Sequence, residues 1–228
     1  MKKSQVKVAI IDNSIDPTIY TPVLHWTSYI DKEWHNFRAK DAVLPDLDQG
    51  YSHIIITGSE ASIVERDGWV YEEISLVQDA VKRGLSILGS CYGHQLLALA
   101  LAGPGSVRRS PHPEIGWIPI RIKESAGILG NNGTAYMFSI HFDEVINLNN
   151  DFSIIASSEF CDIHAFQYKD MPIWGIQAHP EINIKAARIF LKRLIKQGSD
   201  QCFLFKKVLN SFPKDSGLIF TIMKKFLQ

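Results

Sequence analysis

The sequence of 228 residues has no excess of charge of either sign. Its 24 lysine and arginine residues are balanced by 24 aspartate and glutamate residues, so the formal net charge is zero. Phosphate backbones and anionic lipid surfaces attract proteins through a field of positive charge. Because such a field is missing, we expect neither nucleic acid nor a membrane as a partner.

Long apolar runs and cysteines are also scarce. No stretch approaches the roughly 18 consecutive apolar residues that a membrane-spanning helix needs. The first apolar run, residues 8–11, ends at Asp12 and is too short for the apolar region of a signal peptide. Three cysteines are an odd number in a chain long enough to fold without disulfides. These shortages exclude a disulfide framework and predict a cytoplasmic protein.

What the sequence does contain is an alternation of Val- and Ile-rich segments with segments of helical spacing. "VKVAIID", "YSHIIITG" and the end of "SLVQDAVKRGLSILGSC" are typical of strands, and "GHQLLALALAG" is typical of a helix. Strands that alternate with helices form a parallel sheet covered on both faces. We therefore predict an α/β fold with an open, mostly parallel, twisted sheet and a smaller region of antiparallel strands between residues 106 and 177.

The last part of the chain returns to helical spacing. "INIKAARIFLKRLIKQG" predicts a helix that packs back on the sheet, and two amphipathic helices are expected beyond Gly198. We predict one domain over residues 1–198, with residues 199–228 as a helical extension packed on it. The alternative is that these last helices form a surface for a partner.

The stretch "SILGSCYGHQLLALA" has the order of strand, sharp turn and helix that holds a nucleophile above a sheet. Gly89 and Gly93 flank Cys91 and leave room for the tight turn. The thiol of Cys91 would lie at the positive end of the following helix, which stabilises a thiolate. A buried structural cysteine is the alternative, and we expect that role for the other two cysteines, which lack this context.

Four segments, in order along the chain, are similar to motifs of the class I (triad-type) glutamine amidotransferases. They are "ITGSEASI" at 56–63, "GSCYGHQLLA" at 89–98, "MFSIHFDEV" at 137–145 and "GIQAHPE" at 175–181. The similarity covers approximately residues 6–195. It implies a flavodoxin-like fold and hydrolysis of the glutamine side-chain amide by a cysteine nucleophile, without a metal or an organic cofactor.

The tripeptide His-Pro-Glu occurs twice, at 112–114 and at 179–181. A thiol nucleophile needs a base whose second nitrogen is held by a third group, and positions i and i+2 of a strand point to the same side. The second copy ends a predicted strand, at the sheet edge where active sites of open α/β sheets lie. The first copy precedes its strand between two prolines, as expected of a surface loop. We therefore assign the base to His179 and the orienting carboxylate to Glu181, and we regard His112 as incidental.

The resemblance also implies residues around the substrate. Backbone amides of Tyr92 and of the Gly58 turn would hold the oxyanion, and Gln95 would contact bound glutamine. His141 and Asp143 either help to shape the glutamine pocket or belong to a solvated loop after a strand.

The loop after the third strand departs from the family pattern. Many members have Gly-Gly-Pro at this point, whereas Ser59 and Glu60 stand here in place of the second glycine and the proline. This difference resembles stand-alone amidotransferase-like proteins and leaves the substrate of the oxyanion side open. Elsewhere the pattern is kept: His94 follows Cys91 by one helical turn, where the family often has a histidine that is not the base.

Three functions are compatible with this sequence. The first is a glutamine amidotransferase or glutaminase that acts on L-glutamine, with any ammonia-accepting synthetase on a separate chain, since the sequence has no G-x-x-x-x-G-K-[ST] loop for ATP. The second is a γ-glutamyl peptidase or hydrolase with the same triad. The third is a non-catalytic regulator, which an intact set of cysteine, histidine and glutamate disfavours. The sequence does not distinguish the first two.

Overall fold

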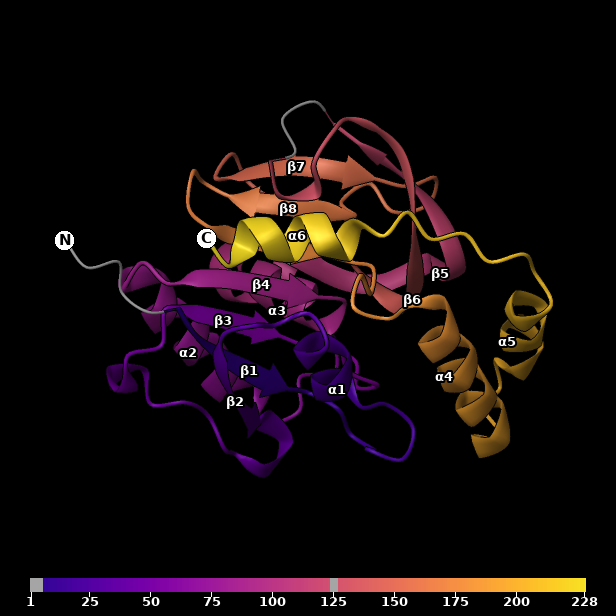
Figure 1. Ribbon diagram of the computed structural model, residues 1–228, viewed down its shortest axis with the longest axis horizontal. Coiled ribbons are helices and arrows are strands. Elements are labelled where there is room, and N and C mark those ends of the chain that lie inside the picture. Colours follow the sequence, from indigo (N-terminus) through magenta and orange to yellow (C-terminus); the bar gives the residue numbers. More distant parts are fainter. Residues whose placement is uncertain (1–5, 124–126) are drawn as a thin grey trace.

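The computed structural model describes residues 6–123 and 127–228, and within them nine strands form one twisted sheet (Figure 1). The strand order is β2-β1-β3-β4-β9-β8-β7-β5-β6. The strands are β1 (Lys7–Asp12), β2 (Glu33–Arg38), β3 (His53–Ile56), β4 (Ser86–Ser90), β5 (Val107–Ile122), β6 (Gly133–Val145), β7 (Phe152–Ser157), β8 (Ala165–Tyr168) and β9 (Ile173–Ile176).

One half of the sheet is parallel, and its inner strands are buried on both faces. β2, β1, β3, β4 and β9 pair in parallel with their neighbours in that order. Val8 and Ile10 of β1 belong to one apolar cluster, whereas Ala9 and Ile11 belong to the cluster on the opposite face. This double burial explains why the strand reads as a continuous apolar run.

The other half of the sheet is antiparallel, which corrects the prediction of a mostly parallel sheet. β9 pairs with β8, β8 with β7, β7 with β5 and β5 with β6, so four of the eight pairings are antiparallel. The antiparallel strands are not a small separate region, because β8 hydrogen-bonds directly to β9 and continues the same sheet. The fold class α/β is confirmed, and the balance of strand directions is not.

Helices cover both faces of the parallel half, as predicted. α2 (Val70–Lys82) and α3 (Tyr92–Ala102) pack on one face. α1 (Pro22–Thr27) and α6 (Leu218–Phe226) pack on the other, where α6 buries four of its apolar residues. Short 3-10 helices occupy Ala39–Asp41, Leu47–Gln49, Pro104–Ser106 and Gly127–Leu129.

Two helices lie beyond the end of the sheet rather than across a face (Figure 1). α4 (Ile184–Gln197) begins at Asn183, whose side chain accepts a hydrogen bond from the Ala186 amide at 3.0 Å, and it ends at Gly198. It packs against α5 (Cys202–Leu209) and against Phe138 of β6. The helix thus packs back on the sheet, as predicted, at the end formed by β5 and β6. The division of the chain at residue 198 stays a prediction.

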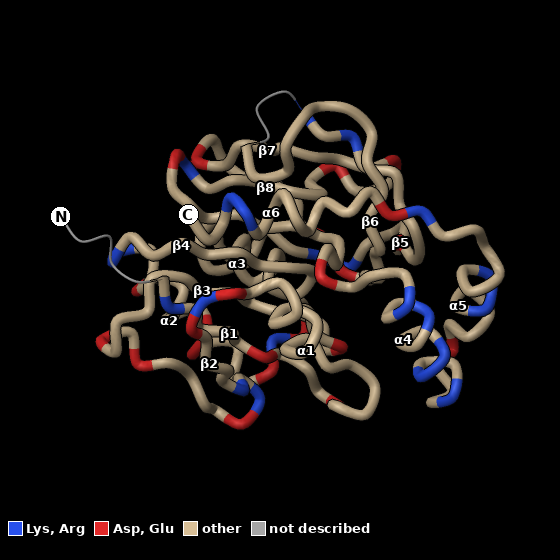
Figure 2. The backbone as a smooth tube through the Cα atoms, viewed as in Figure 1, with Lys and Arg blue, Asp and Glu red and all other residues tan. Residues whose placement is uncertain are grey.

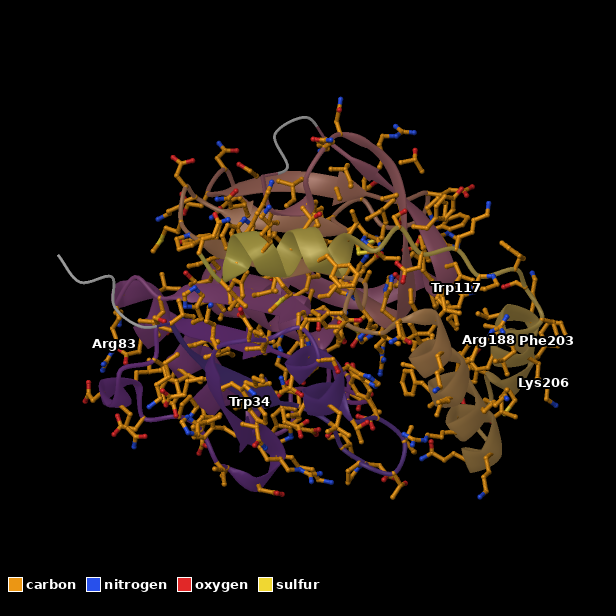
Figure 3. The ribbon with its side chains drawn as sticks, viewed as in Figure 1. Trp34, Arg83, Trp117, Arg188, Phe203 and Lys206 are labelled. Carbon is orange, nitrogen blue, oxygen red and sulfur yellow. The ribbon has the colours of Figure 1, made fainter. Side chains whose placement is uncertain are left out.

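Basic residues are frequent along α4 and α5, although the whole chain is neutral (Figure 2). α4 has no acidic residue and carries five cations, Lys185, Arg188, Lys192, Arg193 and Lys196. Arg188, Phe203 and Lys206 extend from these two helices into solvent (Figure 3). Within the described residues, no helix is long and apolar enough to cross a membrane.

Candidate active site

Cys91 occupies the sharp turn between β4 and α3. Its backbone has φ 49° and ψ −105°, a conformation that residues with a side chain rarely adopt and that is typical of a nucleophile elbow. A Cβ atom on Gly89 would lie 2.4 Å from the carbonyl oxygen of Gly93, and one on Gly93 would lie 2.2 Å from that of Ile56. The two glycines therefore allow the strand, the turn and the helix to approach one another this closely.

The elbow places the thiol at the positive end of α3. Tyr92 is the first residue of this helix, so its amide has no acceptor within the helix. Cys91 itself is 5% exposed, and its sulfur lies 3.6 Å from the carbonyl oxygen of Ile140. The helix dipole and the unpaired amide together favour negative charge on the sulfur and on an oxygen beside it.

His179 and Glu181 lie in a turn that follows β9. The strand ends at Ile176, three residues before the histidine, and not at Pro180 as the sequence predicted. The Nδ1 atom of His179 nevertheless lies 2.9 Å from the Oε1 atom of Glu181, and both residues are almost fully buried. The amide of His179 donates to the carbonyl oxygen of Phe138 at 2.8 Å, which fixes the turn on β6.

Tyr20 is a third member of this buried group, and it was not predicted from the sequence. Its hydroxyl donates to Oε1 of Glu181 at 2.9 Å and lies 3.3 Å from Nδ1 of His179. The Tyr20 ring also meets the His179 ring edge to face, with centroids 5.8 Å apart. Its position in the loop after β1, at the carboxyl edge of the parallel strands, was the signal that would have identified it.

The charges around His179 favour its protonated form. Burial alone lowers the pKa of an imidazole, but the negative charges of Cys91 and Glu181 outweigh burial and raise the pKa of His179 to about 10. With Glu181 on Nδ1, the other ring nitrogen is left for the sulfur of Cys91. This geometry suits a cysteine nucleophile that is paired with an imidazole held by a carboxylate.

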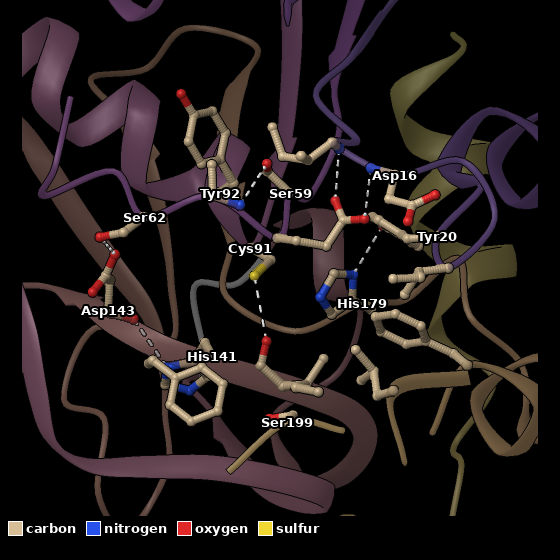
Figure 4. A pocket seen from close by; sticks show the side chains of 18 of the residues that line it. Asp16, Tyr20, Ser59, Ser62, Cys91, Tyr92, His141, Asp143, His179 and Ser199 are labelled. Atoms are coloured by element: carbon tan, nitrogen blue, oxygen red, sulfur yellow. Dashed lines mark hydrogen bonds between the residues drawn. The ribbon is translucent and has the colours of Figure 1, made fainter. Parts of the chain in front are cut away.

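A cavity of about 370 Å³ opens above Cys91 (Figure 4). Of the residues predicted for the site, it is lined by Cys91, Tyr92, Gln95, His141, Asp143 and His179. Glu181 lies behind His179 and does not line the cavity. Gly58 does not line the cavity either. A Cβ atom on Gly58 would lie 2.5 Å from Cε1 of His179, so this glycine packs closely against the histidine ring. The cavity is further lined by side chains that were not predicted from the sequence, including Asp16, Ser62, Arg109 and Leu194.

His141 and Asp143 belong to β6 and are buried, which corrects the alternative of a solvated loop. Nδ1 of His141 donates to the backbone carbonyl of Asp143 at 3.0 Å. The Asp143 carboxylate accepts hydrogen bonds from Ser62 at 2.6 Å and from Arg109 at 3.0 Å. The amide nitrogen of Gln95 donates to the Asp143 carbonyl at 2.8 Å. These contacts hold a polar wall on one side of Cys91.

Glu60 stands where many family members have a proline, and its side chain fixes the loop in another way. Its carboxylate accepts hydrogen bonds from the amides of Ile15 at 2.9 Å and Asp16 at 3.3 Å. Ser59 accepts one from the amide of Ala61 at 3.0 Å. Side-chain hydrogen bonds therefore fix the loop after β3 to the loop after β1, beside the cavity.

The first His-Pro-Glu copy lies inside β5, not in a loop before it. The register of β5 against β6 shifts between Arg109 and Glu114, so the prolines are accommodated by an irregularity in the strand. His112 is exposed and packs on Phe160, away from the cavity lining. Glu114 is buried and lies 3.2 Å from Nε2 of His141 on the neighbouring strand. The glutamate of this copy thus supports the wall of the cavity, which the sequence did not predict.

Other titratable residues near the site are buried and make contacts that support the fold. His94 is buried against Phe166 with Nε2 3.1 Å from the Ile163 carbonyl, and burial lowers its pKa to about 3, so it stays neutral. Glu114, His141 and Cys161 are a buried group with potential ligand atoms within 4.8 Å of one another. Burial raises the pKa of the Cys161 thiol, and a protonated thiol is a poor metal ligand. The histidine in this group is already paired with Glu114.

Comparison with known proteins places these features in a family context. The family model described as Glutamine amidotransferase class-I matches residues 3–196. A glutamine-hydrolyzing GMP synthase subunit from Thermoplasma volcanium is 37% identical over 97 residues, which are 42% of this chain and 47% of that protein. The corresponding protein of Thermoplasma acidophilum is 28% identical over 186 residues, 78% of this chain and 84% of that protein. The match thus spans about half the length of the first relative.

Solved structures of other proteins are similar to this chain in fold. The crystal structure of a glutamine amidotransferase from Thermotoga maritima superposes with a TM-score of 0.76 and covers 98% of this chain and 99% of that one. Its sequence identity to this chain is 20%, so the comparison concerns the fold alone.

Proposed function

This chain belongs to the class I glutamine amidotransferase family, and from that premise we propose that it hydrolyses the side-chain amide of L-glutamine through Cys91, His179 and Glu181. The observation that carries the proposal is the meeting of three elements at one cavity. The strained elbow of β4 and α3 presents the thiol, and the turn after β9 presents a histidine that a buried carboxylate holds at 2.9 Å.

The first half of the reaction forms a thioester. The Cys91 thiolate attacks the amide carbon of glutamine. The amide oxygen becomes an oxyanion beside the amide of Tyr92 and the turn after Gly58, of which Ser59 and Glu60 line the cavity. Protonated His179 gives its proton to the amide nitrogen, the carbon–nitrogen bond breaks, and ammonia leaves. The γ-glutamyl group is then bound to the Cys91 sulfur, and His179 is neutral.

The second half regenerates the thiolate. Neutral His179 takes a proton from a water molecule, and the water oxygen attacks the thioester carbon. The carbon–sulfur bond breaks, glutamate forms, and Cys91 leaves as a thiolate that again pairs with protonated His179. Glu181 keeps Nδ1 of His179 protonated throughout, so that the other nitrogen performs both transfers. The cycle uses no metal and no organic cofactor.

The polar wall supplies the recognition of the amino acid. Arg109 and Asp143 bring charges of both signs to one side of the cavity, and Ser62 adds a hydroxyl, which suits the carboxylate and ammonium groups of glutamine. His141 and Gln95 hold the backbone of this wall in place. The relatives are named as one subunit of a glutamine-hydrolyzing GMP synthase, which supports a separate synthetase chain as the acceptor of the ammonia.

A γ-glutamyl peptidase is the second candidate function. It uses the same residues and differs only in the amine that leaves. Ser59 and Glu60, which stand in place of the family's second glycine and proline and line the cavity, are the departure that keeps this candidate open.

Incubation of the purified chain with L-glutamine, with ammonia and glutamate measured separately, tests the proposal. We expect both products in equal amounts, and no turnover by Cys91→Ser. A glutamine-analogue electrophile should label Cys91 and leave Cys161 unlabelled. Turnover that survives Cys91→Ser would refute the mechanism.

A further inference from the structure

Glu73 of α2 is a buried carboxyl group that the mechanism above does not use. It is 1% exposed, and its Oε1 atom has no hydrogen-bond partner among the described residues. Its Oε2 atom accepts a hydrogen bond from the hydroxyl of Tyr92 at 3.3 Å. The described neighbours that shift its pKa are Asn13 and Tyr92, and neither is a cation. Burying a carboxyl group without a cation costs stability, and such groups gather at functional sites.

Tyr92 connects Glu73 to one side of the oxyanion hole. It follows the nucleophile in the chain, and its backbone amide is the proposed donor at the first turn of α3. The ring points away from the sulfur of Cys91 (Figure 4) and stacks on Trp69 with centroids 5.4 Å apart. The far end of the ring is the hydroxyl that Glu73 binds. α2 thus holds the side chain of the residue whose amide faces the substrate.

Asn13 connects Glu73 to the other side of the oxyanion hole, the turn after Gly58. The side-chain amide of Asn13 lies beside the Glu73 carboxyl and lowers the pKa of that group. The backbone amide of Asn13 donates to Oγ1 of Thr57 at 3.0 Å, and this hydroxyl donates to the carbonyl oxygen of Gly58 at 3.0 Å. Glu73 is therefore joined by short chains of contacts to both sides of the place where the oxyanion develops.

The protonation state of Glu73 decides which hydrogen bonds this group makes. Burial raises the pKa of Glu73 to about 8 and outweighs the smaller effects of Asn13 and Tyr92. The titratable group that faces the carboxyl is Tyr92, whose own pKa burial raises, and the carboxylate of Asp67 acts on Tyr92 in turn. At neutral pH the Glu73 carboxyl is mostly neutral, so it has a proton to donate. Oδ1 of Asn13 is a buried acceptor that lacks a partner in the described part of the chain.

We propose that Glu73 is a positioning residue of the oxyanion hole, which it holds through Tyr92 on one side and through Asn13 on the other. The inference rests on the proposed function, since it concerns the oxyanion of the same reaction. Neutral Glu73 fixes both sides. Ionised Glu73 is a buried negative charge behind the developing oxyanion, and like charges repel. Turnover of glutamine should therefore fall as the pH rises through about 8.

The pH dependence of kcat for glutamine tests this role in two matched variants. Glu73→Gln keeps an acceptor for Tyr92 and a donor for Asn13 but cannot ionise. We expect its kcat at pH 7 to stay within about threefold of wild type, because both sides of the oxyanion hole stay in place. The fall in kcat above pH 8 should be lost. Glu72→Gln removes an exposed carboxylate from the same helix and should keep that fall.

Glu73→Leu removes both hydrogen bonds and measures the size of the effect. Loss of a whole oxyanion donor lowers kcat about 10²–10³-fold, so a displaced donor should lower kcat about tenfold or more with KM nearly unchanged. Alkylation of Cys91 by iodoacetamide is the control, because displacement of iodide creates no oxyanion. Its rate should stay within about twofold of wild type in Glu73→Leu, since the role of Glu73 is confined to the oxyanion.

The outcomes separate this inference from the function on which it rests. If the wild-type chain hydrolyses glutamine and Glu73→Gln shows the same pH dependence of kcat, the inference is wrong and the proposed function stands. Equal losses of turnover and of iodoacetamide alkylation in Glu73→Leu also overturn the inference. If glutamine is not hydrolysed and the glutamine-analogue electrophile does not label Cys91, the proposed function fails and this inference fails with it. The comparison with Glu73→Gln remains decisive even if Glu73→Leu does not fold.

Discussion

The two His-Pro-Glu copies have the same three residues and opposite surroundings. In the copy at 179–181, a turn after β9 buries the histidine and the glutamate together and joins them at 2.9 Å. In the copy at 112–114, an irregular part of β5 leaves His112 exposed and turns Glu114 inward, where it meets His141 of the next strand. The backbone around a motif, and not the motif, decides which side chains meet.

The largest expected effect is the loss of the base in the second copy. His179→Ala removes the group that takes and gives the proton in both halves of the reaction. We expect kcat for glutamine to fall on the order of 10⁵–10⁶-fold, as when a residue of a triad that acts as a unit is lost. Ammonia release at substrate saturation measures it, and a fall of less than tenfold would contradict the assignment.

The glutamate of the second copy should come next. Glu181→Gln keeps the shape but removes the charge that holds the ring, so we expect a loss of about 10³–10⁴-fold in kcat. Burial lowers the pKa of His179, while Cys91 and Glu181 raise it to about 10, so the Glu181→Gln substitution should lower the pKa of His179. The rate of Cys91 alkylation should therefore begin to change at a lower pH on the basic side of its pH profile, where His179 loses its proton. An unshifted limb would show that Glu181 does not act on His179.

Tyr20 contacts both the histidine and the glutamate of the second copy, so its removal tests that pair. Tyr20→Phe removes one hydrogen bond to the Glu181 carboxylate, and a hydrogen bond to a charged group contributes about 1.5–3 kcal/mol. We expect kcat to fall about ten- to a hundredfold with KM nearly constant, and the basic limb of the same alkylation profile to move. A purely structural role would lower the thermal stability and leave that profile in place.

Glu114 should matter for stability more than for chemistry. Burial raises its pKa, but the hydrogen bond with His141 outweighs burial and lowers the pKa below its ordinary value. The stability that this pair contributes is present above the ordinary value of 4.5 and is lost as the pH falls through the lowered pKa. We expect Glu114→Gln to cost about 1–3 kcal/mol at neutral pH, and the difference in Tm from wild type should narrow in acid. A constant difference in Tm from pH 7 to pH 3 would contradict this.

The smallest effect is expected at His112. His112→Ala removes an exposed ring that packs on Phe160 outside the cavity. Turnover should stay within twofold of wild type, and the free energy of unfolding should change by about 0.5 kcal/mol or less, as is usual for surface substitutions. Steady-state kinetics and denaturant unfolding of this variant give the baseline for the other four.

Much of the fold was predictable because apolar runs mark the buried strands. β1, β3 and β4 and the helix α3 fall where the Val- and Ile-rich runs and the helical spacing indicated. β2 was missed because only its last residues are partly buried, so the segment "EWHNFR" lacks the apolar run of its neighbours. The pairing of β8 with β9, which joins the antiparallel strands to the parallel half, was also not predicted, because the sequence of a single strand does not show which strand lies beside it.

The candidate site was also predictable from the sequence only in part. The elbow at Cys91 could be predicted because the two glycines and the helix that this turn needs lie next to Cys91 in the sequence. His179 and Glu181 were expected to meet along a strand, whereas they meet in a turn, so the pairing was predicted for the wrong geometric reason. Tyr20 and Leu194 come from loops and helices far away in sequence, and only the folded chain brings them to the cavity.

The second His-Pro-Glu copy, and not the first, should serve the Cys91 thiolate. The most direct test is the rate at which a glutamine-analogue electrophile labels Cys91, measured by mass spectrometry of the intact chain and its peptides. We predict equal rates in wild type and His112→Ala and a fall of at least about a hundredfold in His179→Ala, as expected when a triad residue is lost. Equal labelling in His179→Ala and wild type, or a comparable loss in His112→Ala, would contradict this assignment.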